Sequence, residues 1–390
     1  MKSDRARGDD RIGPVRSAVH HRLLPWFRAR GRDLPWRRRR TPYRVAVSEL
    51  MLQQTRAEQA APYFERFLRR FPNWRALAEA DGADVLKAWE GLGYYARARN
   101  LHRLARWVVR EGGGRLPRAI EARRRLPGLG PYTAAAVGSL AFGLDEAAVD
   151  GNVRRVLARV FALREARPAR LETEARRLAA ALLPSGRAGA FNEAMMELGA
   201  VVCRPRRPRC EDCPLRSVCR AVAEGRPEAY PPRAPRRRLP HRVVGAAVTF
   251  DARGRVLIAQ RRPEGFLGGL WEFPGGKIEP GETMAECIAR EMKEEMDLEV
   301  EVGERLALVR HAYSHFTIEL HAHFARRLRG RTRRRHCADF AWTPIARLRD
   351  RPFSRADLWI IEALESLPER ERRRWRAWAR SAGPASPGSS

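Results

Sequence analysis

The sequence predicts a two-domain protein in which an all-helical domain precedes an α+β domain. Apolar residues recur at helical spacing over residues 17–200, which is typical of packed amphipathic helices. The pattern then changes, and Val243–Phe250 and Val256–Ala259 are short apolar runs of the kind that form strands. Residues 221–240 lie between the two patterns, are rich in proline and arginine, and are expected to form an extended linker. A length of 390 residues also favours two domains.

The composition restricts the class of partner. Lys and Arg total 77 and Asp and Glu total 46, so the formal net charge is +31, which favours a polyanionic partner such as nucleic acid. Arginine usage in a GC-rich genome would produce part of this excess, so charge alone does not establish nucleic-acid binding. No apolar run reaches the length of a membrane span, and residues 1–16 lack the apolar core of a signal peptide. We expect a cytoplasmic protein with no membrane partner, whose residues 1–16 form a flexible arm.

A helix predicted over residues 43–55 carries one carboxylate, Glu49, among apolar neighbours. On a structural interpretation, Glu49 faces water or pairs with an arginine. On a functional interpretation, burial raises the pKa of Glu49 so that it acts as an acid near neutral pH. Gln54 and Thr55 close the helix with polar groups suited to base edges or phosphates.

The stretch Gly91–Tyr95 interrupts the helices in a different way. Two glycines surround Leu92, and two tyrosines follow, a composition that suits a wedge entering a base stack. A turn covered by core aromatics would have the same composition, so both interpretations stay open at this point.

The stretch Leu126–Ala135 contains Gly128 and Gly130 and leads into an alanine-rich helix. Glycines permit the tight turn between two helices and leave the amides of the next helix open to a phosphate, although an ordinary helix–helix turn looks alike. Asp150 follows where another helix should start, because apolar residues then recur at helical spacing. It is therefore a natural N-cap with a fixed carboxylate, and a capping Asp is usually only a cap.

Six cysteines occur, and four of them lie close together. The four are Cys203, Cys210, Cys213 and Cys219. Zinc and a [4Fe–4S] cluster both accept four cysteines, and the spacing alone does not choose between them. This grouping fits a reduced compartment better than a disulfide framework.

The second domain carries a carboxylate-rich helix after Trp271–Lys277 and Glu282. Its glutamates include Glu291, Glu294 and Glu295. Like charges one helical turn apart repel, so a divalent cation such as Mg²⁺ would explain the group, as would a solvated charged face. Further on, Tyr313–His315 forms a loop between two strands. Residues 369–390 are Arg-rich and then rich in Gly, Pro and Ser, so we expect a disordered tail.

Several of these motifs resemble one family. The hairpin glycines, Asp150 and the four-cysteine loop are similar to those of the helix–hairpin–helix DNA glycosylases. Within that superfamily, Ser48–Thr55 and Gly91–Asn100 resemble the adenine DNA glycosylases of the MutY family, which carry a C-terminal Nudix-like domain. The resemblance implies a [4Fe–4S] cluster rather than zinc. It also implies a domain order, which is a helix–hairpin–helix glycosylase domain over 17–220 with its iron–sulfur loop over 203–219, a linker over 221–240, and a Nudix-like 8-oxoguanine recognition domain over 241–368.

The resemblance also implies a reaction, the hydrolytic removal of adenine paired with 8-oxoguanine or guanine in double-stranded DNA. Glu49 would protonate the flipped adenine, Asp150 would stabilise the oxocarbenium-like sugar, and Tyr132 and Asn152 would orient them. The helix N-terminus at Asp150 is expected to favour its ionised form. Relatives that also cleave the strand have a lysine where this sequence has Tyr132, so a monofunctional glycosylase is expected.

Further residues take binding roles through the same resemblance. The adenine pocket would be lined by Arg32, Trp36, Leu52 and Glu193. Gln54, Leu92 and Tyr94 would lie beside 8-oxoguanine, and Thr55 closes the same polar segment as Gln54. The second domain would read the lesion through Ser314 and His315, although the family often has Phe where this chain has Tyr313. The expected partner is duplex DNA, bound by a monomer.

Two alternatives accompany this reading. The glutamates of the Nudix box are nearly complete in this chain, with Asp297 replacing the usual Gly, so a nucleotide hydrolase using Mg²⁺ is one alternative. A non-catalytic DNA-binding or redox-sensing protein built on the cluster is the other. Glu49 and Asp150 together argue against the hydrolase, whose helical half would only bind DNA and would need neither carboxylate. A DNA-binding assay on Glu49→Gln would distinguish the non-catalytic protein, because a glycosylase should keep its affinity and lose base release.

Overall fold

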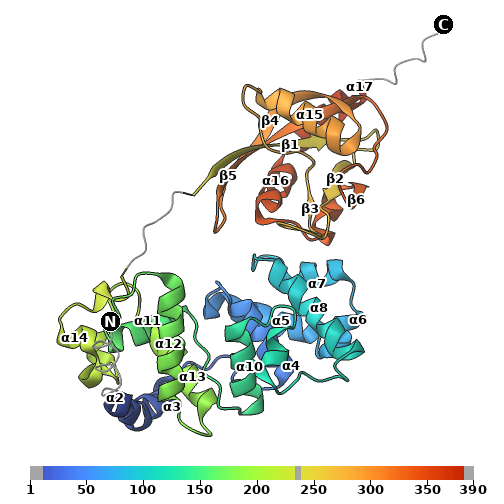
Figure 1. Cartoon of the computed structure of the whole chain (residues 1–390). Coiled ribbons are helices and arrows are strands. Elements are labelled where there is room, and N and C mark those ends of the chain that lie inside the picture. The colour runs from blue at the N-terminus through green and yellow to red at the C-terminus, as the bar shows by residue number, and fades with distance from the viewer. Residues whose placement is uncertain (1–11, 233–238, 382–390) are drawn as a thin grey trace. The chain divides into compact units, whose positions relative to one another are not determined.

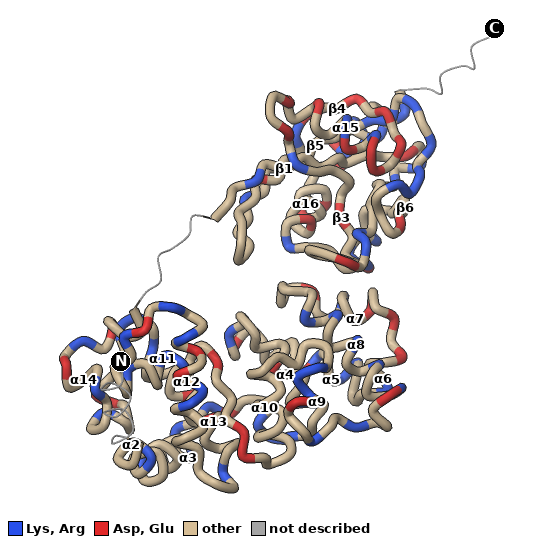
Figure 2. Tube along the Cα trace, in the orientation of Figure 1, with Lys and Arg blue, Asp and Glu red and all other residues tan. Residues whose placement is uncertain are grey.

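A computed structural model of the chain describes residues 12–232 and 239–381 (Figure 1). The chain divides into two compact units, one built from residues 1–79 and 100–236 and the other from residues 80–99 and 237–390. The first unit is helical and the second is α+β, so the predicted fold classes and their order are confirmed. Lys and Arg occur throughout both units (Figure 2). None of the described helices combines the length and hydropathy that a membrane crossing requires.

The first unit consists of helices joined by short turns. They are α2 (Ile12–Ala18), the π-helix η1 (Val19–Leu23), α3 (Leu24–Arg30), α4 (Pro42–Leu52), α5 (Ala57–Arg70), α6 (Trp74–Glu79), α8 (Ala96–Arg110, whose first residues belong to the second unit), α9 (Ile120–Arg124), α10 (Pro131–Phe142), α11 (Gly151–Val160), α12 (Pro168–Leu182), α13 (Ala188–Val201) and α14 (Arg220–Ala223). Short 3-10 turns η2 (Cys210–Asp212), η3 (Arg216–Val218) and η4 (Pro227–Ala229) complete it.

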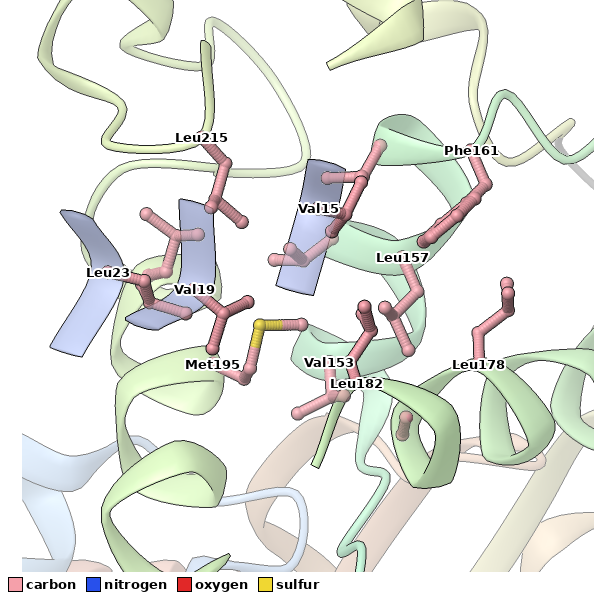
Figure 3. Packing of buried hydrophobic residues seen from close by; sticks show 14 of the residues in the cluster. Val15, Val19, Leu23, Val153, Leu157, Phe161, Leu178, Leu182, Met195 and Leu215 are labelled. Atoms are coloured by element: carbon pink, nitrogen blue, oxygen red, sulfur yellow. The ribbon is translucent and has the colours of Figure 1, made fainter. Parts of the chain in front are cut away.

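The largest core of the first unit joins its N-terminal helices to α11, α12 and α13. Val19, Leu157 and Met195 come from different parts of the chain and interlock there (Figure 3). Burial of these side chains is the main favourable term in folding, and it fixes the first turn of α11, where Asp150 lies.

Two segments expected to lie outside the helical domain, a flexible arm and an extended linker, contribute to this core. The predicted flexible arm is helical from Ile12, because Val15 is buried against α11 and α12; residues 1–11 lie outside the described residues. The first part of the predicted extended linker is also ordered, because Ala221 and Tyr230 are buried in the same cluster. Residues 233–238 lie outside the described residues.

The second unit is built on two small sheets. Its elements are α7 (Gly82–Trp89), β1 (His241–Thr249), β2 (Val256–Gln260), β3 (Trp271–Glu272), α15 (Met284–Met296), β4 (Glu299–Ala312), β5 (Thr317–Arg329), β6 (Asp339–Thr343), the 3-10 helix η5 (Ile345–Asp350), α16 (Arg355–Ser366) and α17 (Glu369–Ser381). One sheet has the order β1-β5-β4, with β1 and β5 parallel, and the other has the order β3-β2-β6 and is antiparallel.

Side chains of β1 alternate between two cores, as the period of a strand requires. Val248 joins the cluster that contains Ile360 of α16. Ala247 joins the cluster that contains Ile288 and Met292 of α15. Strand β1 is therefore covered on both faces, which explains why it reads as a continuous apolar run.

The predicted disordered tail is wrong over residues 369–381, which form α17. Trp375 is buried and stacks on Phe324 of β5 at a centroid distance of 4.1 Å. Trp378, one turn later, meets Trp375 edge-on. Two tryptophans at helical spacing stabilise a segment whose arginine content alone suggests disorder. Residues 382–390 lie outside the described residues.

Segment 80–99 also departs from the predicted boundaries, because it belongs to the second unit rather than to the helical domain over 17–220. The Tyr95 hydroxyl donates to the Phe353 carbonyl at 3.0 Å, and Glu90 accepts from the Phe353 amide at 3.0 Å. These long-range bonds leave no local pattern, so a reading along the chain could not find them.

Candidate active site

Glu49 lies on α4 and is buried, with 4% of its surface exposed. Burial raises the pKa of Glu49 to about 7, and the nearby charges of Asp150 and Glu193 add to the rise. The Tyr132 hydroxyl and Arg37 oppose it. Glu49 is thus half protonated near neutral pH, which is the state that a general acid requires.

Tyr132 lies in the first turn of α10 and donates its hydroxyl proton to Glu49 Oε2 at 2.5 Å. The Tyr132 hydroxyl oxygen also lies 3.1 Å from the Met196 sulfur. Burial and the neighbouring carboxylates raise the pKa of Tyr132 well above its ordinary value, so the phenol keeps its proton. Tyr132 therefore holds the Glu49 carboxyl in one orientation.

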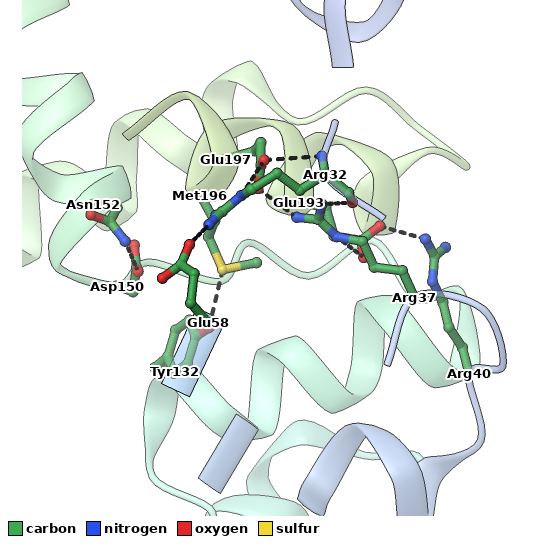
Figure 4. Close-up of polar contacts among 10 residues, drawn as sticks. All are labelled: Arg32, Arg37, Arg40, Glu58, Tyr132, Asp150, Asn152, Glu193, Met196 and Glu197. Atoms are coloured by element: carbon green, nitrogen blue, oxygen red, sulfur yellow. Dashed lines mark hydrogen bonds and ion pairs between the residues drawn. The ribbon is translucent and has the colours of Figure 1, made fainter. Parts of the chain in front are cut away.

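Asp150 caps the N-terminus of α11, as predicted, and accepts from the Val153 amide at 2.7 Å. Asn152 donates to its second oxygen at 2.9 Å (Figure 4). Burial raises the pKa of Asp150, while these hydrogen bonds pull it down. The amides at the helix N-terminus favour the ionised form of Asp150, as expected, but burial has the larger effect and the net shift is upward.

The two hairpin glycines differ in what they require. Gly128 has φ +77°, and a Cβ there would lie 3.2 Å from Leu50 of α4. Gly130 is the N-cap of α10 with an ordinary φ of −64°, and a Cβ there would meet nothing within 4 Å. Only Gly128 needs glycine for its backbone, whereas Gly130 leaves open space before the α10 amides.

A ladder of alternating charges lies beside the site (Figure 4). Arg32 Nε donates to Glu197 Oε1 at 2.7 Å, and Arg37 Nη2 donates to Glu197 Oε2 at 2.9 Å. Arg40 Nη2 donates to Glu193 Oε2 at 2.6 Å. We call these five residues, Arg32, Arg37, Arg40, Glu193 and Glu197, the charge ladder. The two charged residues among the four predicted for the adenine pocket do not pair with each other, because Arg32 binds Glu197 and Glu193 binds Arg40.

The charge ladder sets the ionisation of its two carboxylates in opposite directions. Burial would raise the pKa of Glu197, but the bonds from Arg32 and Arg37 outweigh it and leave the pKa below its ordinary value. Burial raises the pKa of Glu193, against the pull of Arg40 and Arg37. A carboxyl that takes up a proton readily next to Glu49 suits recognition of a nitrogen-rich base.

The remaining predicted residues of the first unit surround α4. Trp36 is buried and meets Phe64 edge-on at 5.6 Å. Leu52 ends α4, half-buried. Gln54 is exposed and has a left-handed φ of 58°. The half-buried Thr55 lies in the same turn, and its amide donates to the Leu52 carbonyl at 3.3 Å.

Leu92 and Tyr94 lie in the second unit, in the loop before α8. Leu92 is buried, and Tyr94 has a left-handed φ of 51° with 41% of its surface exposed. Ser314 and His315 form the exposed turn between β4 and β5, with Ser314 Oγ 3.2 Å from His315 Nδ1. The predicted lesion-reading residues of loop and turn thus belong to the same unit.

Comparison with known proteins identifies the family. Residues 47–181 match the model of the HhH-GPD superfamily base excision DNA repair protein, and residues 245–363 match that of the NUDIX domain. The adenine DNA glycosylase of Rattus norvegicus is 36% identical over 356 residues, which cover 77% of this chain and 69% of that protein. The chain belongs to the adenine DNA glycosylase family. It is therefore a DNA glycosylase of base excision repair and acts on DNA.

Other adenine DNA glycosylases agree. That of Mycolicibacterium smegmatis is 43% identical over 207 residues, covering 53% of this chain and 70% of that protein. The Homo sapiens protein is 37% identical over 322 residues, covering 69% of this chain, and the match spans 59% of the human protein's length. A solved thermostable thymine-DNA glycosylase is 31% identical, covers 55% of this chain and 98% of that chain, and has a TM-score of 0.49.

The four cysteines that the family resemblance singles out lie in and beside the short turns after α13. None of them is in a disulfide. Burial raises the pKa of Cys213 to about 12, and it also raises the pKa of Cys210 and Cys219. Arg159 Nη1 donates to the Cys203 sulfur at 3.3 Å. Soft thiol donors beside a buried arginine are chemically suited to an anionic iron–sulfur centre.

The glutamates expected to hold Mg²⁺ are paired with an arginine of the same helix. Arg290 donates to Glu291 at 3.0 Å and to Glu294 at 3.3 Å. Among the described residues, no three His, Cys, Asp or Glu side chains, the four cysteines included, lie close enough to hold one metal ion. Glu295 points elsewhere and accepts from the Gly275 amide at 3.4 Å. An arginine neutralises the repulsion that seemed to demand a cation.

Sequence reasoning missed several residues that surround the candidate site. Glu197 is 1% exposed and receives two arginines of the charge ladder. Gly199 of α13 has no room for a side chain, because a Cβ there would lie 2.5 Å from the Asn152 Cβ. Arg155 donates to Asn152 Oδ1 at 2.9 Å and to the Cys203 carbonyl at 2.8 Å. The one sequence feature that pointed to these residues was the presence of glutamates on the otherwise apolar helix α13. Their role could not be assigned until their arginine partners were known.

Proposed function

We propose that this glycosylase removes adenine paired with 8-oxoguanine, or with guanine, from double-stranded DNA by hydrolysing the N-glycosidic bond without cleaving the strand. The observation that carries the proposal is Glu49, a buried carboxyl with a pKa of about 7 that is oriented by Tyr132 and lies near a second carboxylate, Asp150. Two carboxyl groups in different environments are what acid-assisted glycoside cleavage requires.

The first step is protonation of the departing base. The duplex delivers its adenine by flipping it out of the stack. Protonated Glu49 gives its proton to a ring nitrogen of adenine, and the electrons of the glycosidic bond leave with the base. Tyr132 keeps the donating oxygen aimed through its 2.5 Å hydrogen bond.

The second step is capture of the sugar by water. Departure of the base leaves positive charge on the sugar, and the ionised Asp150, held by the Val153 amide and Asn152, stabilises it. Glu49, now a carboxylate, takes a proton from the attacking water. The new bond joins the water oxygen to the sugar carbon, and Glu49 regains its proton.

In this proposal, one group of residues recognises the flipped adenine and a second group recognises the base opposite it. Arg32, Trp36, Leu52 and Glu193 surround the flipped adenine. The opposite base meets the residues that the family resemblance indicates, namely Gln54, Thr55, Leu92, Tyr94, Ser314 and His315. Stacking and hydrogen bonds to an unpaired base edge are how proteins read a base out of the helix.

Absence of strand cleavage rests on the lack of an amine. Tyr132 occupies the position where a lysine would attack the sugar, and a phenol cannot form a Schiff base. Lys87, Lys277 and Lys293 all belong to the second unit. No lysine occurs in the described part of the first unit, which holds Glu49 and Asp150.

The cysteine loop would hold a [4Fe–4S] cluster through Cys203, Cys210, Cys213 and Cys219. Four free thiols and the arginine on Cys203 support this, and the bound cluster would supply a covalent cross-link for the loop. A protein with these free thiols is expected to work in a reduced compartment, the cytoplasm, as a monomer.

Two variants test the chemistry. Glu49→Gln and Asp150→Asn should each bind a duplex with adenine opposite 8-oxoguanine about as tightly as the unmodified protein, and each should release adenine at least about 100-fold more slowly. Equal loss of binding and release would mean that these residues only hold DNA. Undiminished release by Glu49→Gln would rule out Glu49 as the acid.

A further inference from the structure

Two loops of the second unit carry the residues that the proposed function assigns to reading the lesion. We call residues 91–94 the wedge loop and residues 313–315 the reading turn. They are far apart in sequence, yet both belong to the unit built from residues 80–99 and 237–390. We call residues 261–270 the bridge loop. It contacts α8, the helix that follows the wedge loop, and it also contacts the reading turn.

Arg97, in the first turn of α8, holds the wedge loop. Its Nη2 atom donates to the Leu92 carbonyl at 3.2 Å and to the Gly93 carbonyl at 3.0 Å. Its guanidinium lies 5.5 Å from the Trp89 ring and 5.2 Å from the Tyr94 ring. The wedge loop is therefore attached to α8 by its backbone and by its exposed aromatic side chain.

Arg99, two residues later on α8, holds the bridge loop. Nη1 donates to the Gly268 carbonyl at 2.8 Å, and Nη2 donates to the Gly265 carbonyl at 3.2 Å. A planar guanidinium fits two carbonyls at once, which a lysine cannot do. The first turn of α8 thus grips both loops.

The bridge loop is itself rigid. A Cβ on Gly268 would lie 2.3 Å from the Pro263 carbonyl oxygen, so the backbone there is closely folded. Arg261 Nε donates to the Phe266 carbonyl at 3.2 Å, and Gln260 donates to the Gly269 carbonyl at 3.1 Å. Its carbonyl groups are held by side chains along its length.

Phe266, at the tip of the bridge loop, rests on the reading turn. Its ring meets Tyr313 at 4.9 Å, His315 at 5.2 Å and Phe316 at 5.2 Å, each edge-on. It nevertheless keeps 40% of its surface exposed. An exposed phenylalanine that contacts three rings fixes the position of the reading turn more than it contributes to a core.

We propose that Arg99 and Phe266 are positioning residues that fix the reading turn relative to the wedge loop, so that preference for 8-oxoguanine depends on the two together. Arg97 of α8 binds the wedge loop, and Arg99 of the same helix binds the bridge loop. Phe266 of the bridge loop contacts His315 of the reading turn. This inference rests on the proposed function, which supplies the substrate.

A double-mutant cycle tests the coupling. Full-length protein carrying Arg99→Ala, His315→Ala or both is assayed for kcat/KM of adenine release from two duplexes, with 8-oxoguanine or guanine opposite the adenine. Arg99→Ala should lower the preference for 8-oxoguanine about tenfold, and His315→Ala should then reduce it little further. Phe266→Ala should behave as Arg99→Ala does. If the loss of preference in the double variant equals the product of the losses in the two single variants, the residues act independently and the inference is overturned.

Controls separate structure from coupling. Arg110→Ala removes the same charge from an exposed position of α8 and should leave the preference unchanged. Arg99→Lys keeps the charge and lacks the second hydrogen bond, so it should recover only part of the preference. If Arg99→Lys restores it fully, charge and not positioning is responsible, and the inference is wrong. No adenine release from either duplex by the unmodified protein would instead overturn the proposed function.

Discussion

At the scale of single residues, the site depends on how the environment of each carboxyl sets its pKa. Burial and the charges of Asp150 and Glu193 raise the pKa of Glu49 more than the hydrogen bond from Tyr132 lowers it. Glu197, equally buried, stays ionised because two arginines bind it. Burial alone therefore does not decide protonation, and the partners do.

Glu49 should cost the fold stability. Its pKa rises from 4.5 to about 7 on folding, so the folded state binds more protons between those pH values and stability falls as pH rises through that window. Above pH 7 the cost is on the order of 3 kcal/mol. We expect Glu49→Gln to raise the melting temperature at pH 8 more than at pH 5. A melting temperature equally changed at both pH values would contradict the assigned pKa.

Tyr132 should set the alkaline limit of the reaction. The hydrogen bond from Tyr132 lowers the pKa of Glu49. Tyr132→Phe should therefore raise that pKa and shift the alkaline limb of the pH–rate profile toward higher pH by about one unit. The profile of single-turnover adenine release from pH 5 to 10 measures this. A shift toward acid would mean that Tyr132 does not stabilise the carboxylate.

At the scale of elements, α11 and α13 approach so closely that a glycine is required. Gly199 of α13 faces Asn152 in the first turn of α11. The same turn presents Asp150 and, through Arg155, reaches the cysteine loop. Packing of two helices thus places the charge that the proposed reaction needs.

Gly199→Ala should impair the site by steric means. The added methyl group would lie 2.5 Å from the Asn152 Cβ, so the start of α11 must move. Overpacking of this kind costs about 1–3 kcal/mol, and a displaced Asp150 should slow adenine release about tenfold or more. Gly13→Ala, which meets nothing within 4 Å, is the matched control. Equal rates for both variants would show that α11 tolerates the contact.

Elements with a strong local pattern could be predicted from sequence, and long-range partners could not. The helices around Glu49, the cap at Asp150 and the first strands of the second unit follow from periodicity and turn chemistry. Helix α17 was missed because two tryptophans, Trp375 and Trp378, outweigh its arginines. Arg290 was not recognised as the partner of the Nudix-box glutamates, because neutralisation depends on geometry.

At the scale of the whole molecule, the net charge of +31 should dominate affinity for DNA. The cysteine loop exposes Arg204 and Arg206. Because each phosphate contact releases condensed counterions, Arg206→Gln should weaken binding to any duplex and reduce the slope of log affinity against log salt by about one. Titrations at several salt concentrations measure the slope. Weaker binding only to the mispair would instead assign Arg206 to base recognition.

The central claim is that the protein removes adenine by hydrolysis alone. The most direct measurement incubates the full chain with a duplex that holds one adenine opposite 8-oxoguanine, and scores free adenine and strand breaks separately before any alkali. We predict adenine release with an intact strand. Release accompanied by strand cleavage would show that another amine attacks the sugar. An adenine that stays attached in a bound duplex would contradict the glycosylase account itself.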